Sequence, residues 1–485
     1  MSDCCDPPAR DGYDVAVIGA GSAGFSAAIT AAELGARVAL IGHGTIGGTC
    51  VNVGCVPSKT LIRAAEAVHN GRSATRFPGL EGAIRLQSWE QLAASKDELV
   101  SDLRQKKYVD LLPAYPGIHY IEGQARFSGE AIEVGGAPLK AGKIILVTGA
   151  RAAVPAIPGV DAVPFLTSTT ALALDRLPQS LLVIGGGVIG VELGQMFARL
   201  GVAVTIVCRS RLLPELDREV SEALQTYLEA EGVRVCAGSA YRQIERTANG
   251  IELTCEALTN DRGACPERGA SQFALVAEQV LIATGRRPNS DGMGLNGRGV
   301  TLAANGGIVV DEYLETNVAG IYAAGDVTGR DQYVYMAAYG AKLAARNAVE
   351  GNAHCYDNST MPSVVFTDPQ VASVGVTQAQ AEARGLAVKT SLVQLDQVPR
   401  ALAARDTRGF IKLVAERETG RLIGGQIMAP EGADSIQTLV LAIKHRMTAA
   451  ELGATIFPYL TTVEGLKLAA QTFDKDVALL SCCAG

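Results

Sequence analysis

The stretch Tyr13-Asp14-Val15-Ala16-Val17-Ile18-Gly19-Ala20-Gly21-Ser22-Ala23-Gly24 runs from an apolar segment into a glycine-rich turn. An Ala-rich segment continues to Leu34, and a second apolar run extends from Arg37 to Ile41. Strand, G-x-G-x-x-G, helix and strand in this order are typical of a dinucleotide-binding βαβ unit. The first glycine makes the tight turn, the second lets the backbone approach a pyrophosphate, and the third packs the helix on the strand. We therefore predict a nucleotide-binding turn at Gly19, Gly21 and Gly24, with the helix N-terminus facing the phosphates.

The same pattern occurs a second time. The run Ser180–Ile184 leads into Gly185-Gly186-Gly187-Val188-Ile189-Gly190, a helix-like segment to Leu200 and an apolar run from Val202 to Val207. One G-x-G-x-x-G motif is weak evidence, because glycine clusters also mark ordinary turns. Two copies in the same strand and helix context, about one domain apart, predict two nucleotide-binding domains. The expected contacts in the second are Gly185, Gly187 and Gly190.

The domain organisation follows from the length and from where these motifs lie. A chain of 485 residues suggests about three domains. Strands ending at Thr148-Gly149 and Thr284-Gly285 mark the points where the chain passes between nucleotide domains, and no dinucleotide motif follows Met361. We predict an α/β fold of two Rossmann-like domains with a C-terminal α+β domain. The expected boundaries are 1–155 and 284–360 for the first nucleotide domain, 156–283 for the second and 361–485 for the C-terminal domain.

Composition and charge restrict the partners. The net charge of −7 and the pI near 5.5 argue against nucleic acid, and no basic run indicates a membrane surface. Residues 1–10 are polar and lack the apolar core of a signal peptide, so we expect a cytoplasmic protein. Most of the 11 cysteines should then be thiols, and closely spaced pairs suggest redox or metal chemistry.

One such pair lies just after the first βαβ unit, in Cys50-Val51-Asn52-Val53-Gly54-Cys55-Val56-Pro57-Ser58-Lys59. This spacing lets the two cysteines occupy neighbouring turns at a helix start, within reach of an S–S bond. A helix N-terminus and a nearby Lys59 both favour the thiolate. The alternative is two buried cysteines that merely pack.

The string from Gly47 to Lys59 resembles the redox motif of the pyridine nucleotide–disulfide oxidoreductases, a family that includes glutathione reductase, dihydrolipoamide dehydrogenase and mercuric reductase. The resemblance covers nearly the whole chain, with the motifs in the expected order. It implies FAD and a nicotinamide nucleotide as cofactors. It also implies a Cys55 thiolate touching the flavin, with Cys50 as the exchanging thiol, and an ion pair of Lys59 with Glu192 near the flavin and nicotinamide.

The resemblance assigns the FAD contacts residue by residue, with one departure. Asp326, in Gly325-Asp326, would bind the ribityl chain. The end of the second strand usually carries an acid for the adenosine ribose, but here it reads Leu40-Ile41-Gly42-His43. The predicted FAD contacts are Gly19, Gly21, Gly24, Gly44, Gly48, Thr49, Lys59, Ala125, Asp326 and Val334.

The second nucleotide site indicates its ligand more directly. Its second strand ends Ile206-Val207-Cys208-Arg209-Ser210-Arg211, with no acid for a ribose 2′-hydroxyl. Two arginines stand there instead, and guanidinium groups suit a 2′-phosphate. Arg209 and Arg211 therefore favour NADPH over NADH, the alternative being an ordinary solvated face.

The chain ends Leu480-Ser481-Cys482-Cys483-Ala484-Gly485. Adjacent cysteines form only a strained disulfide, but their thiolates can together bind one soft ion. The alternative is a tail without function. Cys4 and Cys5 form a second adjacent pair, which nothing else in the sequence places near the site.

The substrate prediction rests on a missing histidine. Members that act on organic thiols carry a C-terminal His-Pro followed by Glu, where the His moves a proton. Here the matching stretch is Ile456-Phe457-Pro458-Tyr459, with Glu464 following, and Phe457 cannot transfer protons. We therefore expect a substrate that needs no such help.

These features resemble the mercuric reductase branch of the family. The resemblance implies NADPH-dependent reduction of Hg(II), delivered as a thiol complex, to Hg(0). Cys482 and Cys483 would capture the metal and pass it to Cys50 and Cys55, with Tyr459 and Tyr108 lining the path. Ordinary packing of both tyrosines is the alternative.

The resemblance also implies a homodimer whose active sites combine residues of both chains. We expect the chain to start at the flavoprotein core, without the additional N-terminal metal-binding domain of many relatives.

Two other functions stay open: a thiol–disulfide reductase of the large thioredoxin reductase type, and a non-catalytic thiol protein that sequesters soft metal.

Overall fold

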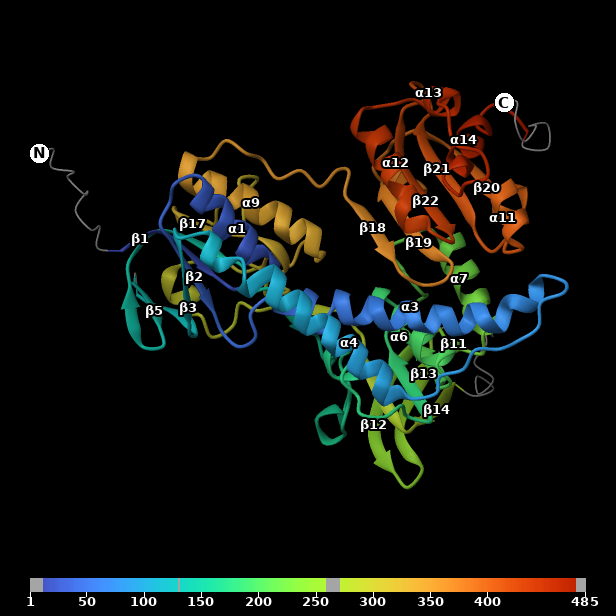
Figure 1. Ribbon diagram of the computed structural model, residues 1–485, viewed down its shortest axis with the longest axis horizontal. Coiled ribbons are helices and arrows are strands. Elements are labelled where there is room, and N and C mark those ends of the chain that lie inside the picture. The colour runs from blue at the N-terminus through green and yellow to red at the C-terminus, as the bar shows by residue number, and fades with distance from the viewer. Residues whose placement is uncertain (1–11, 130, 259–270, 477–485) are drawn as a thin grey trace, which may run out of the picture. The chain divides into compact units, whose positions relative to one another are not determined.

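The computed structural model describes residues 12–129, 131–258 and 271–476, which form two compact units (Figure 1). Unit 1 contains the chain up to Ser58 together with Gln91–Ala153 and Gly285–Asp357. Unit 2 contains Lys59–Glu90, Val154–Thr284 and the chain from Asn358. Unit 2 thus holds both the predicted second nucleotide domain and the predicted C-terminal domain.

Unit 1 is built on a parallel five-stranded sheet of order β17-β7-β1-β2-β3. Helix α1 (Ser22–Glu33) connects β1 to β2 and packs against α9 (Val334–Glu350). Apolar side chains of both helices share one buried cluster with alternate residues of the strands. The strands are β1 (Tyr13–Ile18), β2 (Val38–Gly42), β3 (Ile118–Glu122), β7 (Ala141–Leu146) and β17 (Ile321–Ala323).

The opposite face of this sheet packs on a small antiparallel sheet of order β4-β5-β6. Its strands are β4 (Ala125–Ser128), β5 (Ala131–Val134) and β6 (Ala137–Leu139). The N-terminal half also contains α2 (Gly48–Val53), α3 (Cys55–Arg72), α4 (Trp89–Arg104) and the π-helix η2 (Gln105–Val109).

The nucleotide-binding part of unit 2 repeats the design with a parallel sheet of order β11-β10-β9-β15. Helix α6 (Val188–Arg199) follows the glycine turn, and α7 (Arg218–Ala230) follows the second strand. A second, antiparallel sheet of order β12-β13-β14 shares the core of this region. The strands are β9 (Ser180–Ile184), β10 (Ala203–Val207), β11 (Arg234–Cys236), β12 (Ser239–Thr247), β13 (Gly250–Ala257), β14 (Gln272–Ala277) and β15 (Gln279–Ile282).

The C-terminal part of unit 2 is an antiparallel sheet of order β18-β19-β22-β21-β20 covered by helices. The predicted fold class, two Rossmann-like regions and a C-terminal α+β region, is confirmed. Among the residues that the structure describes, no helix is both long and apolar enough to cross a membrane. The strands of this region are β18 (Pro362–Val365), β19 (Gln370–Gly375), β20 (Val388–Gln394), β21 (Phe410–Glu416) and β22 (Leu422–Ala429). Its α-helices are α10 (Gln378–Ala383), α11 (Pro399–Ala404), α12 (Gly432–Lys444), α13 (Ala449–Ala454) and α14 (Glu464–Gln471).

Candidate active site

The first glycine turn has the geometry of a phosphate site. Gly19 has φ +123°, and a β-carbon there would collide with the carbonyl of Val147. A β-carbon at Gly24 would collide with the Gly19 carbonyl, so the helix can approach the strand only without a side chain. Helix α1 begins after Gly21 with no side-chain cap, which leaves its first N–H groups available to an anion. These features fit the pyrophosphate of a dinucleotide.

The second turn resembles the first at its first and third glycines. Gly185 also has φ +123°, and its β-carbon would collide with the carbonyl of Ala283. A β-carbon at Gly190 would collide with the Gly185 carbonyl. Gly187 precedes α6 without a side-chain cap and faces open space, with no atom within 4 Å of where its β-carbon would be. This turn also fits a dinucleotide.

The cysteine pair lies at the junction of two helices beside the first turn. Cys50 is in α2, Cys55 is the first residue of α3, and both are half-buried. Gly54 separates the helices, and a β-carbon there would lie 3.3 Å from the Cys50 Cα, so the two segments approach closely. Gly48, with φ +68°, packs against Gly21 of the nucleotide turn. Cys55 thus lies at the positive end of α3, which favours its thiolate.

Tyr108 lies close to this junction and to the nucleotide turn. Its hydroxyl is 3.0 Å from the Ser22 Oγ, and its ring packs edge-on against Phe25 at 4.9 Å. Burial raises the pKa of Tyr108, the Ser22 hydrogen bond lowers it, and the Cys50 and Cys55 thiols raise it further. The phenol therefore keeps its proton at neutral pH. The structure thus brings Tyr108 together with the predicted redox pair.

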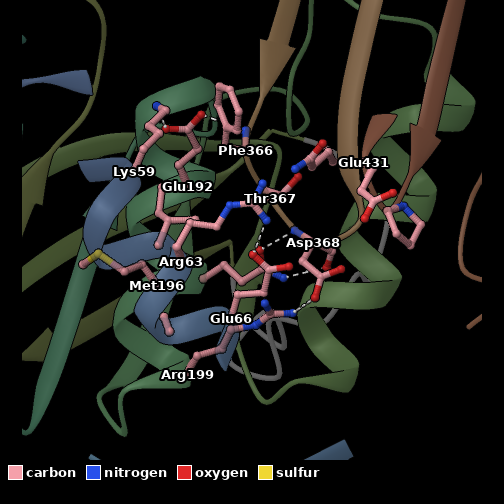
Figure 2. A pocket seen from close by; sticks show the side chains of 15 residues that line it. Lys59, Arg63, Glu66, Glu192, Met196, Arg199, Phe366, Thr367, Asp368 and Glu431 are labelled. Carbon is pink, nitrogen blue, oxygen red and sulfur yellow. Dashed lines mark hydrogen bonds and ion pairs between the residues drawn. The ribbon is translucent and has the colours of Figure 1, made fainter. Parts of the chain in front are cut away.

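The predicted ion pair between Lys59 and Glu192 is present, with Nζ 2.7 Å from Oε2 (Figure 2). Lys59 is on α3, one helical turn after Cys55, and its ammonium group lies over the Phe366 ring at 4.9 Å. Glu192, on α6, is 4% exposed, and its Oε1 accepts a hydrogen bond of 2.8 Å from the Phe366 backbone N–H. Both carboxylate oxygens are therefore fixed.

A polar row on α6 continues from this ion pair. Gln195 accepts a hydrogen bond from the Asp368 N–H at 2.8 Å and donates one to the Asp368 carbonyl at 2.9 Å. Arg199 donates to the Asp368 carboxylate at 2.8 Å. Glu192, Gln195 and Arg199 together hold the segment from Phe366 to Asp368 against α6. They line a cavity of about 160 Å³ (Figure 2).

The far end of this row is a buried charge cluster. Arg199, 5% exposed, binds Glu231 at 2.6 Å as well as Asp368. Arg408 binds the same two carboxylates at 3.4 and 3.1 Å. Burial lowers the pKa of Arg408, but hydrogen bonding to Asp406 and the nearby carboxylates outweigh it and raise the pKa overall. Because buried charges are costly without partners, this cluster fixes the end of α6.

The two arginines after β10 differ in their surroundings. Arg209 is exposed. The guanidinium of Arg211 turns toward the loop that precedes α7, donating to the carbonyls of Pro214 and Leu216 at 2.8 Å and to the Ser221 Oγ at 2.5 Å. Arg209 is therefore the arginine whose guanidinium is available to a ligand.

The family profile described as "Pyridine nucleotide-disulphide oxidoreductase" matches residues 13–345, and that of its dimerisation domain matches residues 361–470. The chain belongs to this family. It is 44% identical to mercuric reductase of Streptomyces lividans, covering 98% of this chain and 99% of that protein. It is 46% identical to mercuric reductase of Shigella flexneri, covering 97% and 82%.

Solved structures agree with this assignment. The HOCl-induced flavoprotein disulfide reductase RclA from Escherichia coli is 30% identical, with a TM-score of 0.81 over 95% of this chain and 99% of that one. Membership of the family confirms the predictions of an FAD-dependent oxidoreductase and of FAD and NADPH as its cofactors. The individual contacts to these cofactors stay predictions.

Asp326 is the predicted contact to the ribityl chain. It lies in a short turn just after β17, and its carboxylate is 3.7 Å from the Arg286 Nε. Burial raises the pKa of Asp326, and the Arg286 charge opposes that shift. Of the other predicted FAD contacts, Ala125 begins β4, Val334 begins α9, and Gly44 has φ +77° in the loop after β2. Thr49 is exposed in the first turn of α2.

The segment that replaces the family's histidine lies in the dimerisation domain. Phe457 packs against the core of this domain, whereas Tyr459 is 49% exposed. Glu464 is buried, and its carboxylate accepts a hydrogen bond of 3.1 Å from the Leu460 N–H. Cys482 and Cys483, the predicted metal-capturing pair, lie outside the described residues, as do Cys4 and Cys5.

Sequence reasoning missed Gln195 and Asp368, which hold the segment next to Glu192. A signal for Gln195 was present, because Glu192, Gln195 and Arg199 recur at helical spacing on an otherwise apolar α6. Asp368 gave no signal, since its partners lie far away along the chain.

Proposed function

We propose that this chain reduces Hg(II) to Hg(0) with electrons from NADPH, as part of mercury detoxification. The observation that carries the proposal is Phe457. Reductases of organic disulfides carry a His at this position, and that His transfers a proton. Phe457 is an aromatic hydrocarbon and cannot do so. A dithiol flavoenzyme of this kind suits an acceptor that needs electrons but no proton. The 43% to 46% identity to mercuric reductases over almost the whole chain supports the same substrate.

Electron transfer, Hg(II) binding and stabilisation of the thiolate are assigned to different groups. FAD, when bound, relays two electrons between the nicotinamide and the dithiol. Cys50 and Cys55 bind Hg(II) as a pair of thiolates, and soft sulfur ligands suit this soft ion. The N-terminus of α3 and the Lys59 ammonium stabilise the Cys55 thiolate. Glu192 holds Lys59 in place through its fixed carboxylate. In total NADPH loses a hydride, Hg(II) gains two electrons and one proton is released.

Delivery of Hg(II) is assigned to the C-terminal cysteines. Cys482 and Cys483 take the metal from its thiol complex and pass it by ligand exchange to Cys50 and Cys55 of the partner chain. Tyr459 and Tyr108 line this path. The dimerisation domain supports a homodimer, and the exposed apolar residues Ile456, at 95%, and Leu460, at 43%, support burial of this segment by a second chain.

Selectivity for NADPH over NADH is assigned mainly to Arg209. Its exposed guanidinium suits the 2′-phosphate, while Arg211 fixes the loop behind it. A cytoplasmic location stays a prediction.

Steady-state NADPH oxidation with and without thiol-liganded Hg(II), followed together with the flavin absorbance, tests the proposal. We expect a yellow protein whose flavin is reduced by NADPH and reoxidised only when Hg(II) is added. Rapid turnover of a disulfide substrate but not of Hg(II) would favour a disulfide reductase like the structural relative instead. A colourless protein that binds Hg(II) without oxidising NADPH would indicate a sequestering thiol protein.

The delivery step has its own test. Replacing Cys482 and Cys483 together by Ala should abolish Hg(II)-dependent NADPH oxidation when Hg(II) is presented as a thiol complex. Reduction of the flavin by NADPH should be unaffected, because neither residue belongs to a nucleotide motif. Full turnover of thiol-liganded Hg(II) by this variant would contradict the delivery role.

A further inference from the structure

Strand β2 ends at Gly42, where nucleotide sites of this fold usually carry an acid for the adenosine ribose. The position is close to the first glycine turn, because the Gly19 N–H donates to the carbonyl of Ile41 at 2.8 Å. Neither Gly42 nor the exposed His43 supplies a carboxylate. The end of β2 therefore offers the ribose no acidic side chain.

The neighbouring strand fills the space that Gly42 leaves. Strand β3 pairs in parallel with β2, with Tyr120 opposite Leu40 and Glu122 opposite Gly42. A β-carbon at Gly42 would lie 2.7 Å from the Tyr120 hydroxyl oxygen and 2.7 Å from the Ala20 β-carbon. An acidic side chain at position 42 would therefore collide with the phenol. Gly42 and Tyr120 form a matched pair in which the glycine makes room for the hydroxyl.

The Tyr120 hydroxyl is placed to interact with a ligand. Tyr120 is half-buried, and its hydroxyl forms no hydrogen bond to any residue within the described ranges. It lies beside Ala20, between the first two glycines of the nucleotide turn. Burial raises the pKa of Tyr120, and the charge of Glu122 raises it further, so the phenol keeps its proton and can both donate and accept.

We propose that Tyr120 takes over the role of the missing acid and hydrogen-bonds the adenosine ribose of FAD. The proposal depends on FAD as the cofactor and not on the electron acceptor, so it stands or falls independently of Hg(II) reduction. A neutral phenol gains less from a ribose hydroxyl than a carboxylate does, and it avoids placing a negative charge beside the pyrophosphate.

The test compares FAD with an analogue whose adenosine carries 2′,3′-dideoxyribose. Apoprotein is prepared from the purified holoenzyme, and both dissociation constants are measured by quenching of flavin fluorescence. Wild type should bind FAD about 3- to 10-fold more tightly than the analogue, the value of one hydrogen bond. The Tyr120→Phe variant should bind FAD more weakly than wild type by a similar factor, and it should bind FAD and the analogue almost equally. Tyr115→Phe, in the loop before β3, serves as the control and should retain wild-type discrimination.

The ratio of the FAD affinity to the analogue affinity distinguishes a lost hydrogen bond to the ribose from a general distortion of the site. A general distortion by Tyr120→Phe would weaken FAD and the analogue equally and leave their ratio unchanged, and this result would overturn the proposal. Undiminished FAD binding by Tyr120→Phe would also overturn it. Loss of discrimination in Glu122→Gln with full discrimination in Tyr120→Phe would assign the ribose to the carboxylate instead of the phenol.

Discussion

The two glycine turns, one in each unit, have almost the same backbone and yet are predicted to bind different cofactors. Gly19 and Gly185 share φ +123°. The Gly19 N–H donates to the carbonyl of Ile41 near the end of β2, and the Gly185 N–H donates to the carbonyl of Val207 at the end of β10, each at 2.8 Å. In both turns the third glycine is required because a β-carbon would collide with the carbonyl of the first. We therefore expect the turn to recognise only what FAD and NADPH have in common, the pyrophosphate.

The difference between the turns begins where the second strand ends. Strand β2 ends at the uncharged Gly42, whose lack of a side chain leaves room for the Tyr120 hydroxyl, whereas the exposed Arg209 lies two residues after the end of β10. The helices after the turns differ as well. Helix α1 packs with apolar residues against α9, whereas α6 presents Glu192, Gln195 and Arg199 to the segment containing Asp368. On the proposed function, a common backbone would supply phosphate binding, and side chains outside the turn would supply selectivity.

The largest expected effect comes from the third glycine of each turn. Gly24→Ala should weaken FAD binding by about 10- to 100-fold, because overpacking here pushes the helix away from the strand. Gly190→Ala should weaken NADPH binding by a similar factor and leave the flavin bound. Flavin content after gel filtration and titration of the flavin by NADPH measure the two effects. Loss of both FAD and NADPH binding in either variant would show that the two turns do not act as separate sites.

The next largest effect concerns the strand ends. Arg209→Ala should raise the KM for NADPH by about 10-fold and leave that for NADH unchanged, because a screened charge-assisted contact to the 2′-phosphate is lost. Arg211→Ala should instead lower the melting temperature, because its guanidinium holds the carbonyls of Pro214 and Leu216. Steady-state kinetics with both nucleotides and thermal unfolding separate these outcomes. A shift in nucleotide preference from Arg211→Ala alone would reverse the assignment.

A smaller effect is expected in the polar row of α6. Gln195→Leu should slow reduction of the flavin by NADPH by about 3- to 10-fold, because two hydrogen bonds that hold the segment beside Glu192 are lost. The FAD content should not change. Gln225→Leu removes a comparable amide from α7, where it bonds Glu229, and serves as the control. Equal rates in the two variants, measured by stopped-flow absorbance, would mean that Gln195 does not position Glu192.

The smallest expected effect is that of pH on FAD affinity. Because the pKa of Tyr120 is raised above its ordinary value near 10, the phenol stays protonated throughout about pH 6 to 9. FAD affinity should therefore show no Tyr120-dependent change in this range. Fluorescence titrations of wild type and Tyr120→Phe check this. A fall in wild-type affinity between about pH 8 and 9 that disappears in the variant would show that the phenol loses its proton there.

Much of this organisation could be predicted from the sequence. Both turns, the helix start at Cys55 and the α/β architecture follow from local spacing, and the ion pair of Lys59 with Glu192 follows from the family resemblance. The separate short helix that contains Cys50 could not be predicted, because the spacing indicated a single helix start for both cysteines. The inward turn of Arg211 could not be predicted, because it depends on carbonyl positions in the following loop. The meeting of Tyr120 with Gly42 likewise requires the register of two strands that are distant along the chain.

Reduction of Hg(II) by the Cys50 and Cys55 dithiol is tested by measuring mercury vapour and NADPH consumption in the same reaction. The wild-type enzyme should release one Hg(0) per NADPH oxidised. Cys50→Ser and Cys55→Ser should each release essentially none while retaining FAD, since neither lies in the glycine turn. NADPH oxidation without Hg(0), or undiminished release by either variant, would show that this dithiol does not reduce Hg(II).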